Sequence, residues 1–400
     1  MTVLDLYDDG TVGAVRDQLV SAANHELYES YFAEAGIDPD DVDSWADFRE
    51  LPFTSVDDLL SDVEEHPPEG SLFEEGSLIS FTPAKAGELP VYETPADIER
   101  YEEIHRTLYE RIGLEPGMRG IMTHSYHHFG TGYITHRQLE AFGIEMYPAG
   151  PGNAERTADI IQEFDIDVFV GNPSFALEVA DHGADAIDVV IGGGEPFTSI
   201  PGQREAVHEA FGGLDCAVDN FGLRQATPVA IECAAEAGLH VAEASVIVEI
   251  IDPDTGEVLD PGERGEVVLT HVGKEAMPLV RYRTGDLSVL EGGDCSYCDA
   301  TVTMPKGVFG RTDERLKVKG VKMYPEGVVL VLAGFPGLTG EHQIRVSRPD
   351  NTDKLTVIVE GTADEDELRG QLTEQLQITP DEIRFVDELG DVPTVVDERH

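Results

Sequence analysis

The 400-residue chain carries 79 acidic residues against 27 basic ones, which gives a formal net charge of −52. A chain of this length is expected to form two domains, and its hydrophobic fraction of 41% is sufficient for buried cores. The charge excludes nucleic acid and anionic membranes as partners held by bulk electrostatics, because those surfaces attract cations. It also favours a halophilic protein, since molar salt screens the repulsion between so many carboxylates.

The first residues predict a cytoplasmic protein. Residues 1–9 contain no basic residue and no long apolar run, so we expect no signal peptide. No stretch approaches the roughly 20 continuous apolar residues of a membrane-spanning helix. Four cysteines in so long a chain are too few for a disulfide scaffold.

Helix signals are recognisable in the first quarter of the chain. Thr54-Ser55-Val56-Asp57 has the spacing of a capping box and predicts that a helix follows it. Thr94-Pro95-Ala96-Asp97 has the same spacing, with proline at the first helical position. Apolar residues then recur at helical spacing as far as Ile112, and Gly113 ends the helix.

Strands and helices alternate between residues 120 and 222. The predicted strands are 120–123, 144–147, 167–171, 189–192 and 216–219. Helices are expected up to 142, over 154–164, from 174 onward and after 201. This alternation predicts a mostly parallel sheet with helices on both faces. Ligands bind beyond the carboxyl ends of such strands, so the candidate site loops are 124–130, 171–174, 192–197 and 220–228.

The pattern changes after Leu239. Residues 246–251 and 266–271 read as strands, and turn sequences at 252–256 and 261–265 indicate antiparallel connections. The predicted fold class is therefore α/β. A large N-terminal domain spans residues 1–310, with mostly parallel sheets, flanking helices and a small antiparallel β subdomain at about 239–310. A small α+β domain with short strands and a helix near 365–375 follows over residues 311–400.

Two strand ends carry residues suited to a flat ligand. Gly192-Gly193-Gly194-Glu195-Pro196 follows a predicted strand, and its glycines would let a nucleotide approach the backbone. A plain turn between a strand and a helix has the same pattern. Asn220-Phe221-Gly222 offers an aromatic ring that could stack on a base or belong to the core. In Arg281-Tyr282-Arg283-Thr284-Gly285-Asp286, the aspartate suits ribose hydroxyls or a salt-bridged turn equally well.

Lysine is scarce in the chain but clustered in one segment. Four of the seven lysines lie between Lys306 and Lys322. Against an acidic background, such a cluster favours an anion such as phosphate as its ligand.

Cys233, His240, Cys295 and Cys298 form a candidate zinc site. Cys295-Ser296-Tyr297-Cys298 has the C-x₂-C spacing, and the four side chains supply three thiolates and one imidazole. A site with four protein ligands has no open position, so its role would be structural. Buried free thiols beside an exposed histidine are the alternative. The histidines at 124, 127 and 128 lie among aromatic residues and favour a pocket wall over a metal site.

Taken in order, these segments resemble the phenylacetate–CoA ligase group of the adenylate-forming acyl-CoA synthetase superfamily. The resemblance runs from Leu51 to about Glu360. Its most specific stretches are Gly171-Asn172-Pro173-Ser174-Phe175, Gly193-Gly194-Glu195-Pro196, Glu232-Cys233 with Gly238-Leu239-His240, Lys274-Glu275-Ala276-Met277-Pro278, Arg281–Asp286 and Gly310-Arg311-Thr312-Asp313.

The resemblance implies an enzyme that activates a carboxylic acid with ATP and transfers the acyl group to CoA. The implied nucleotide-binding residues are Gly193, Gly194, Glu195, Pro196, Phe221, Gly222, Asp286 and Arg311. The implied acyl pocket contains Tyr126, Phe129, Gly171 and Ser174, and Lys317, Lys319 and Gly320 would face CoA. Asp313 would be the hinge of a mobile C-terminal domain. The group also has matching positions for the four zinc ligands.

Three features depart from the family's pattern. The phosphate loop would fall at Ser80–Glu88, which has one glycine and a proline where a backbone N–H would be useful. Gln225 stands where the family has a magnesium-binding carboxylate, so magnesium binding is left open. The family's C-terminal lysine has no counterpart after Lys354, and we assign no catalytic residue.

The leading hypothesis is an acid–CoA ligase that forms AMP. The alternative is a pseudoenzyme that binds AMP, an acyl-adenylate or CoA as a sensor or partner subunit. A third hypothesis is an enzyme that uses only the thioester half-reaction. The pocket residue types suit an aromatic or medium apolar acid without selecting one, and the resemblance favours a homodimer.

Overall fold

A computed structural model describes residues 2–84, 87–184, 187–312, 316–319, 321–349, 353–376, 378–390 and 392–399. The chain divides into two compact units. The first contains residues 1–197, 205–284 and 288–308, and the second contains residues 198–204, 285–287 and 309–400. Asp313 and Gly320, which the sequence proposes as hinge and CoA contact, lie outside the described residues, as does the side chain of Lys317.

Short helices open the first unit: η1 (Val3–Leu6), α1 (Asp9–Ala22), α2 (Glu26–Ala35), η2 (Pro39–Asp41), α3 (Trp45–Arg49) and α4 (Val56–Glu65). The capping box of α4 uses Ser55 and Asp58, one residue later than the sequence spacing indicates. The hydroxyl of Thr54 instead donates to the carbonyl oxygen of Val280 at 2.7 Å. None of the described helices is long and apolar enough to cross a membrane.

A hairpin and a long helix come next. Strands β1 (Leu78–Ala84) and β2 (Gly87–Glu93) pair antiparallel. Helix α5 (Pro95–Ile112) begins at the capping box of Thr94 with Asp97 and ends at Gly113, whose φ of 92° is left-handed. Both ends of this helix confirm the sequence prediction.

The largest sheet has nine strands in the order β13-β14-β9-β8-β7-β6-β5-β3-β4. Its parallel part confirms the predicted alternation and consists of β3 (Arg119–Met122), α6 (Thr131–Phe142), β4 (Glu145–Pro148), α7 (Ala154–Glu163), β5 (Val168–Gly171), α8 (Pro173–Asp181), β6 (Val189–Gly193), α9 (Gln203–Phe211) and β7 (Cys216–Leu223).

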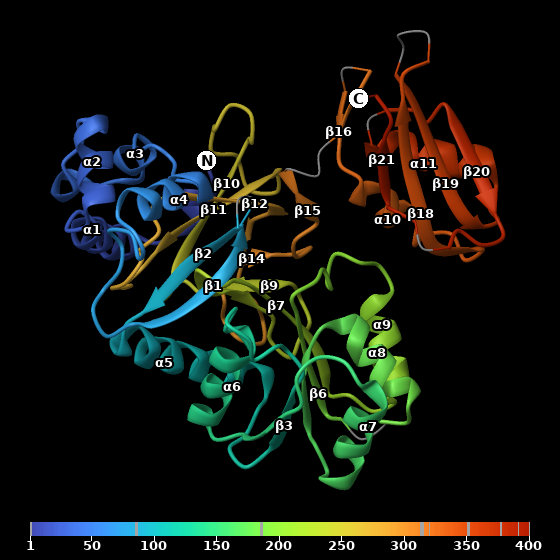
Figure 1. Cartoon of the computed structure of the whole chain (residues 1–400), viewed down its shortest axis with the longest axis horizontal. Helices are drawn as coiled ribbons and strands as arrows, with labels where there is room; N and C mark the ends of the chain where they lie inside the picture. Colours follow the sequence, from blue (N-terminus) through green and yellow to red (C-terminus); the bar gives the residue numbers. More distant parts are fainter. Residues whose placement is uncertain are drawn as a thin grey trace. The chain divides into compact units, whose positions relative to one another are not determined.

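Helices cover both faces of this parallel part (Figure 1). Val168 and Val170 pack in one core with residues of α5 and α6, whereas Phe169 between them packs in another core with residues of α7, α8 and α9. The alternation follows from the opposite directions of successive side chains on a strand. Every residue of β5 and of β6 is therefore buried.

The same sheet continues with antiparallel strands β8 (Ala226–Ile231), β9 (Leu239–Val241), β13 (Glu291–Gly292) and β14 (Val302–Met304). The segment 220–228 is therefore mostly the β7–β8 hairpin and not the loop that the sequence predicts. Strands β10 (Val246–Ile251) and β11 (Arg264–His271) pair antiparallel, and β12 (Tyr282–Val289) lies next to β11 in their sheet. These strands form the antiparallel region expected after Leu239.

The second unit contains its own α/β core. Its elements are β15 (Gly310–Arg311), β16 (Leu316–Val318), β17 (Val321–Met323), α10 (Glu326–Leu332), β18 (Leu338–Ser347), β19 (Lys354–Gly361), α11 (Glu365–Leu376), β20 (Glu382–Val386) and β21 (Val395–Asp397). The sheet order is β20-β19-β18-β21, and side chains of α10 and α11 share a core with β18 and β19.

Candidate functional site

Three adjacent parallel strands bring the candidate loops of the first unit to one edge of the sheet. Gly171 of β5 is in register with Gly192 of β6, and Gly193 of β6 is in register with Asn220 of β7. The carboxyl ends of parallel strands meet at the same edge, which is the usual ligand-binding edge of such sheets. The glycine turn and Asn220 are therefore neighbours, as the sequence predicts.

A cavity of about 150 Å³ opens at this edge. Its lining consists of His124, Thr131, Ile134, Thr135, Val170, Ile191, Gly192, Gly193, Gly194, Asn220, Gly222, Leu223, Arg224 and Thr227. The lining includes the apolar side chains of two isoleucines and a valine, and the glycine-rich backbone of residues 192–194. Gly194 has a left-handed φ of 83°, so the turn needs glycine there. The combination suits an apolar group joined to a flat polar one.

Glu195 binds the start of α8. Its carboxylate accepts hydrogen bonds from the backbone N–H of Ser174 at 2.6 Å and from the Ser174 hydroxyl at 2.9 Å. A carboxylate at a helix N-terminus is stabilised by the free N–H groups and the helix dipole. Both residues line a neighbouring hollow of about 310 Å³. A predicted nucleotide residue and a predicted acyl-pocket residue are thus in direct contact, while Pro196 beside them is exposed.

The aromatic loop after β3 supplies one wall of the cavity. His124 lines it, and burial lowers the pKa of this imidazole, which favours its neutral form. Tyr126 packs partly against the core and shares a 2.7 Å hydrogen bond with Nδ1 of His136, and burial raises its pKa. The ring of Phe129 lies 4.3 Å from that of His128. Among these aromatic side chains, His124 is the one that the cavity lining includes.

Phe221 is half-buried and packs against the core formed with the N-terminal helices. The cavity lining contains its neighbours Asn220 and Gly222. Stacking of Phe221 on an adenine ring stays a prediction.

A buried ion pair that includes Arg224 of the cavity lining was not predicted from the sequence. Nη2 of Arg224 lies 2.6 Å from Oε2 of Glu93, and Nη1 contacts the other carboxylate oxygen. The side chains are only 5% and 2% exposed, so the pair is almost completely withdrawn from water. The signal that could have found it is an arginine next to Gln225 together with an acidic residue ending an apolar strand.

The residues around Gln225 do not fit a magnesium ion. Nε2 of Gln225 donates to the Tyr282 hydroxyl at 3.1 Å, and Arg224 places a positive charge beside it. Glu93 is already engaged by Arg224 through both oxygens. Magnesium requires oxygen ligands, usually carboxylates, and is repelled by a fixed cation.

Two further predicted nucleotide residues belong to the second unit, where Nη1 of Arg311 lies 2.7 Å from Oδ1 of Asp286. The pairing Asp286↔Arg311 between β12 and β15 aligns them. In the same unit, Nζ of Lys319 lies 2.6 Å from Oδ1 of Asp381. Lys319 thus has an internal acidic partner in addition to any ligand.

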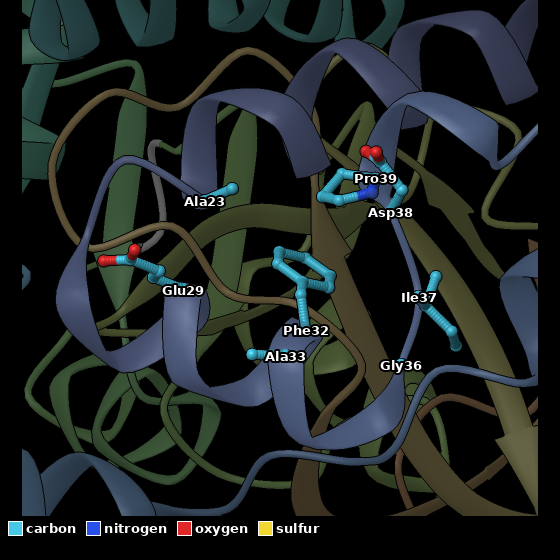
Figure 2. A pocket seen from close by; sticks show the side chains of 8 residues that line it. All are labelled: Ala23, Glu29, Phe32, Ala33, Gly36, Ile37, Asp38 and Pro39. Atoms are coloured by element: carbon cyan, nitrogen blue, oxygen red, sulfur yellow. The ribbon is translucent and has the colours of Figure 1, made fainter.

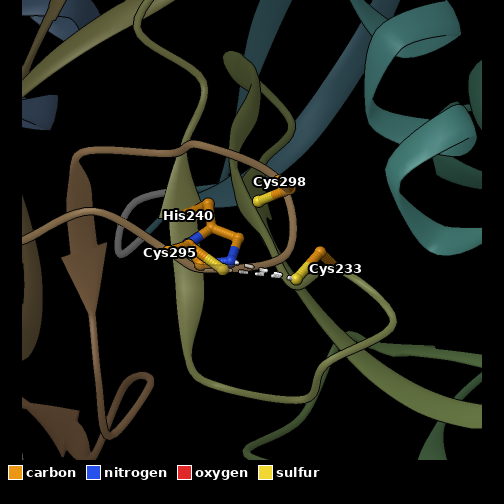
Figure 3. Close-up of side chains that lie close together, drawn as sticks. All are labelled: Cys233, His240, Cys295 and Cys298. Atoms are coloured by element: carbon orange, nitrogen blue, oxygen red, sulfur yellow. Dashed lines mark hydrogen bonds between the residues drawn. The ribbon is translucent and has the colours of Figure 1, made fainter.

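The four predicted zinc ligands lie together in the first unit (Figure 3). Their sulfur and nitrogen atoms all lie within 4.8 Å of one another. The Cys233 and Cys295 sulfurs are 3.9 Å apart, and Nε2 of His240 is 3.3 Å from the Cys233 sulfur. A tetrahedral zinc ion with bonds of about 2.3 Å to sulfur would separate its sulfur ligands by about 3.8 Å. The donor types and spacing therefore fit zinc.

Burial shifts the pKa values of two of these groups when the cluster holds no metal. It raises the pKa of the Cys233 thiol to about 12 and lowers the pKa of His240 to about 4. The neutral imidazole is already in its ligating form, whereas a thiol must lose its proton to bind. Nδ1 of His240 is buried without a hydrogen-bond partner among the described residues.

The amino-acid sequence has clear relatives. It is 32% identical over 364 residues to a phenylacetate–coenzyme A ligase of Thermus thermophilus, which covers 87% of this chain and 77% of the relative. A phenylacetate–coenzyme A ligase of Aromatoleum evansii is 32% identical over 83% of this chain and 76% of its own length. The chain belongs to the phenylacetate–CoA ligase family. The profile of the AMP-binding enzyme C-terminal domain also matches residues 320–386.

Solved structures show the same fold in members of the adenylate-forming superfamily. A 2-hydroxyisobutyryl-CoA ligase in complex with R3-HIB-AMP, in the postadenylation state, has a TM-score of 0.85 at 21% identity, covering 98% of this chain and 90% of that one. An amide bond synthetase from Marinactinospora thermotolerans has a TM-score of 0.60 at 17% identity, covering 81% of this chain and 68% of that one.

A separate hollow of about 390 Å³ lies on the N-terminal helices of this family member (Figure 2). It is lined by Ala23, Glu29, Phe32, Ala33, Gly36, Ile37, Asp38 and Pro39. Its two charged residues are both acidic, and it has no nucleophile, imidazole or cation in its lining. We therefore place the candidate site at the sheet edge.

Proposed function

We propose that the protein is an AMP-forming acid–CoA ligase. In the first half-reaction, a carboxylate oxygen attacks the α-phosphorus of ATP, which forms the acyl-adenylate and releases pyrophosphate. In the second, the CoA thiol attacks the acyl carbon, loses its proton and releases AMP. The observation that carries the proposal is the cavity at the ends of β6 and β7, lined by apolar side chains and by glycines, in a chain of the phenylacetate–CoA ligase family.

The cavity suggests where each part of the acyl-adenylate binds. Ile134, Val170 and Ile191 would contact the apolar part of the acid, and the Gly192–Gly194 turn would approach the nucleotide. Asp286 and Arg311 would add nucleotide contacts, and residues 311–400 would move about a hinge near Asp313. Lys317, Lys319 and Gly320 would face CoA. These roles follow the family's pattern, and no single catalytic residue is assigned.

The proposed acid is aromatic or medium-sized and apolar, as the curated relatives' name phenylacetate indicates. The decisive experiment is pyrophosphate release in molar KCl with ATP, magnesium and a panel of aryl and acyl acids. CoA-dependent thioester formation with at least one acid is the expected result. The second candidate is a pseudoenzyme, because Gln225 stands where the family has a metal ligand. Saturable binding of AMP or CoA, with no pyrophosphate release for any acid, would favour it.

We further propose a zinc ion at Cys233, His240, Cys295 and Cys298, where its role would be structural. Four protein ligands would complete its coordination, so the metal would take no part in the reaction. We also propose that the protein is cytoplasmic, forms a homodimer and functions in molar salt.

A further inference from the structure

Two buried hydrogen-bond donors meet beside the first residue of α6. Among the described residues, Nε of Arg224 and the hydroxyl of Ser80 have no hydrogen-bond partner, and both are withdrawn from water. A Cβ atom added to Gly130 would lie 3.1 Å from Nε of Arg224 and 3.4 Å from Oγ of Ser80. Buried donors almost always have an acceptor in folded proteins. Two neighbouring donors that both lack one therefore indicate a missing acceptor.

The arginine is fixed in this position by Glu93. Both of its terminal nitrogens contact the Glu93 carboxylate, which is also buried. A fork-to-fork contact holds the guanidinium plane and leaves Nε–H, together with one N–H on each terminal nitrogen, for other acceptors. The arginine is therefore oriented before any ligand arrives.

The start of α6 adds a third element. Gly130 is the N-cap of this 12-residue helix, has a left-handed φ of 75° and provides no side-chain cap. The next residue, Thr131, lines the same cavity as Arg224. The N-terminus of a helix presents N–H groups and a positive dipole end, and both favour a negatively charged oxygen.

We propose that Nε of Arg224, the Ser80 hydroxyl and the N-terminus of α6 bind an oxyanion of the substrate directly, without a divalent cation. The inference rests on the proposed function for the identity of that oxyanion. It is a phosphate oxygen of the nucleotide or the carboxylate of the acid, which share the same acceptor chemistry. Arg224 would then supply the positive charge in place of a magnesium ion, which the residues around Gln225 do not fit.

Binding of three probes tests the site independently of catalysis. Inorganic pyrophosphate, AMP and phenylacetate are titrated by calorimetry into the full chain in molar KCl, with and without added magnesium. At least one probe is expected to bind equally well without magnesium. The double variant Glu93→Gln/Arg224→Gln is expected to weaken that probe about tenfold or more, the loss typical of a charge-assisted contact. Weakened pyrophosphate or AMP identifies a phosphate site, and weakened phenylacetate identifies a carboxylate site.

The double variant removes both charges together, so neither is left buried and unpaired. The matched control is Glu266→Gln/Arg283→Gln, which removes a similar ion pair away from the cavity and should leave all three affinities unchanged. Ser80→Ala is the second test, because it deletes one donor and leaves the ion pair intact. If the double variant does not fold, the Ser80→Ala result decides.

The proposal is overturned if the Glu93→Gln/Arg224→Gln variant binds all three probes with unchanged affinity. If that double variant does not fold, unchanged affinity in Ser80→Ala overturns it. Binding that depends on magnesium for every probe also overturns it. Failure of the ligase proposal gives a different result: no pyrophosphate is released, yet anion binding and its dependence on Arg224 persist.

Discussion

Nε2 of His240 lies 3.3 Å from the sulfur of Cys233, although the two residues belong to different segments of the large sheet. Cys233 follows β8 and His240 lies within β9, which pairs antiparallel with β8. Strand pairing thus sets two of the four candidate ligands at a zinc-binding distance, and the turn between β13 and β14 supplies the other two.

Purified protein should contain about one zinc ion per chain. Replacing His240 with alanine or Cys295 with serine should lose the metal and lower the free energy of unfolding by at least about 2 kcal/mol, because metal binding and folding are coupled. Metal analysis and urea unfolding in molar KCl measure both effects. Cys216→Ser is the control, since Cys216 is a buried core residue outside the cluster and should keep the zinc. A wild-type content below about 0.2 zinc per chain would refute the site.

Salt should be necessary for stability. The formal charge of −52 produces repulsion whose range falls from about 10 Å at 0.1 M salt to about 3 Å at 1 M. We expect the midpoint of thermal unfolding to rise steadily as KCl is increased over this range. Circular dichroism at several salt concentrations provides the measurement, and a midpoint that does not change with salt would contradict the halophilic interpretation.

Acid should destabilise the protein through His105. This α5 residue is completely buried, its Nδ1 lies 2.7 Å from the Tyr101 carbonyl oxygen, and burial lowers its pKa to about 4. Between the unfolded value of about 6.5 and about 4, the unfolded chain binds the extra proton, so stability falls as the pH falls. The loss attributable to this residue is roughly 3 kcal/mol.

Urea unfolding at pH 7 and pH 4.5 measures this loss. His105→Gln can keep the hydrogen bond to Tyr101 but cannot titrate, so it should show a smaller loss than the unchanged chain. Equal losses in the two proteins would assign the acid sensitivity to other groups, namely the carboxylates or the other histidines whose pKa burial lowers, such as His271.

Gly171 should tolerate no side chain. A Cβ atom there would lie 1.8 Å from Oγ1 of Thr123, a buried hydroxyl that donates to the carbonyl oxygen of Val170. Gly171→Ala is expected to cost about 1–3 kcal/mol of unfolding free energy through overpacking, and to disturb the strand ends that form the cavity. Thermal unfolding and AMP binding report the two effects.

The overlap itself can be tested with a double variant. Thr123→Ala removes the clashing oxygen, so its combination with Gly171→Ala should be more stable than the sum of the two single effects predicts. Strict additivity would show that the strain at Gly171 comes from another neighbour.

The sequence predicted features with local or chemically specific signals. The capping box at Thr94 and the terminating Gly113 define α5 because caps act within a few residues. The clustering of Cys233, His240, Cys295 and Cys298 was predictable because three thiols and an imidazole form a donor set with few other uses. Alternation of strands and helices predicted the parallel sheet.

Contacts between distant segments were not predictable in this way. Arg224 and Glu93 are 131 positions apart, and no periodic pattern links them. The cap of α4 is Ser55 and not Thr54, whose hydroxyl makes a tertiary hydrogen bond to Val280. Similarly, the 220–228 segment carries glycine and proline that indicate a loop, yet pairing with neighbouring strands makes it a hairpin.

The last strands of the large sheet are too short to be stable through backbone pairing alone. β13 has two residues and β14 and β9 have three each, yet they cover the side of β8 that would otherwise be an open edge. An open edge invites pairing with another chain and aggregation. A metal that links Cys233 and His240 to the β13–β14 turn would keep this edge covered. Loss of the ion would then show first as self-association, before any change at the nucleotide cavity.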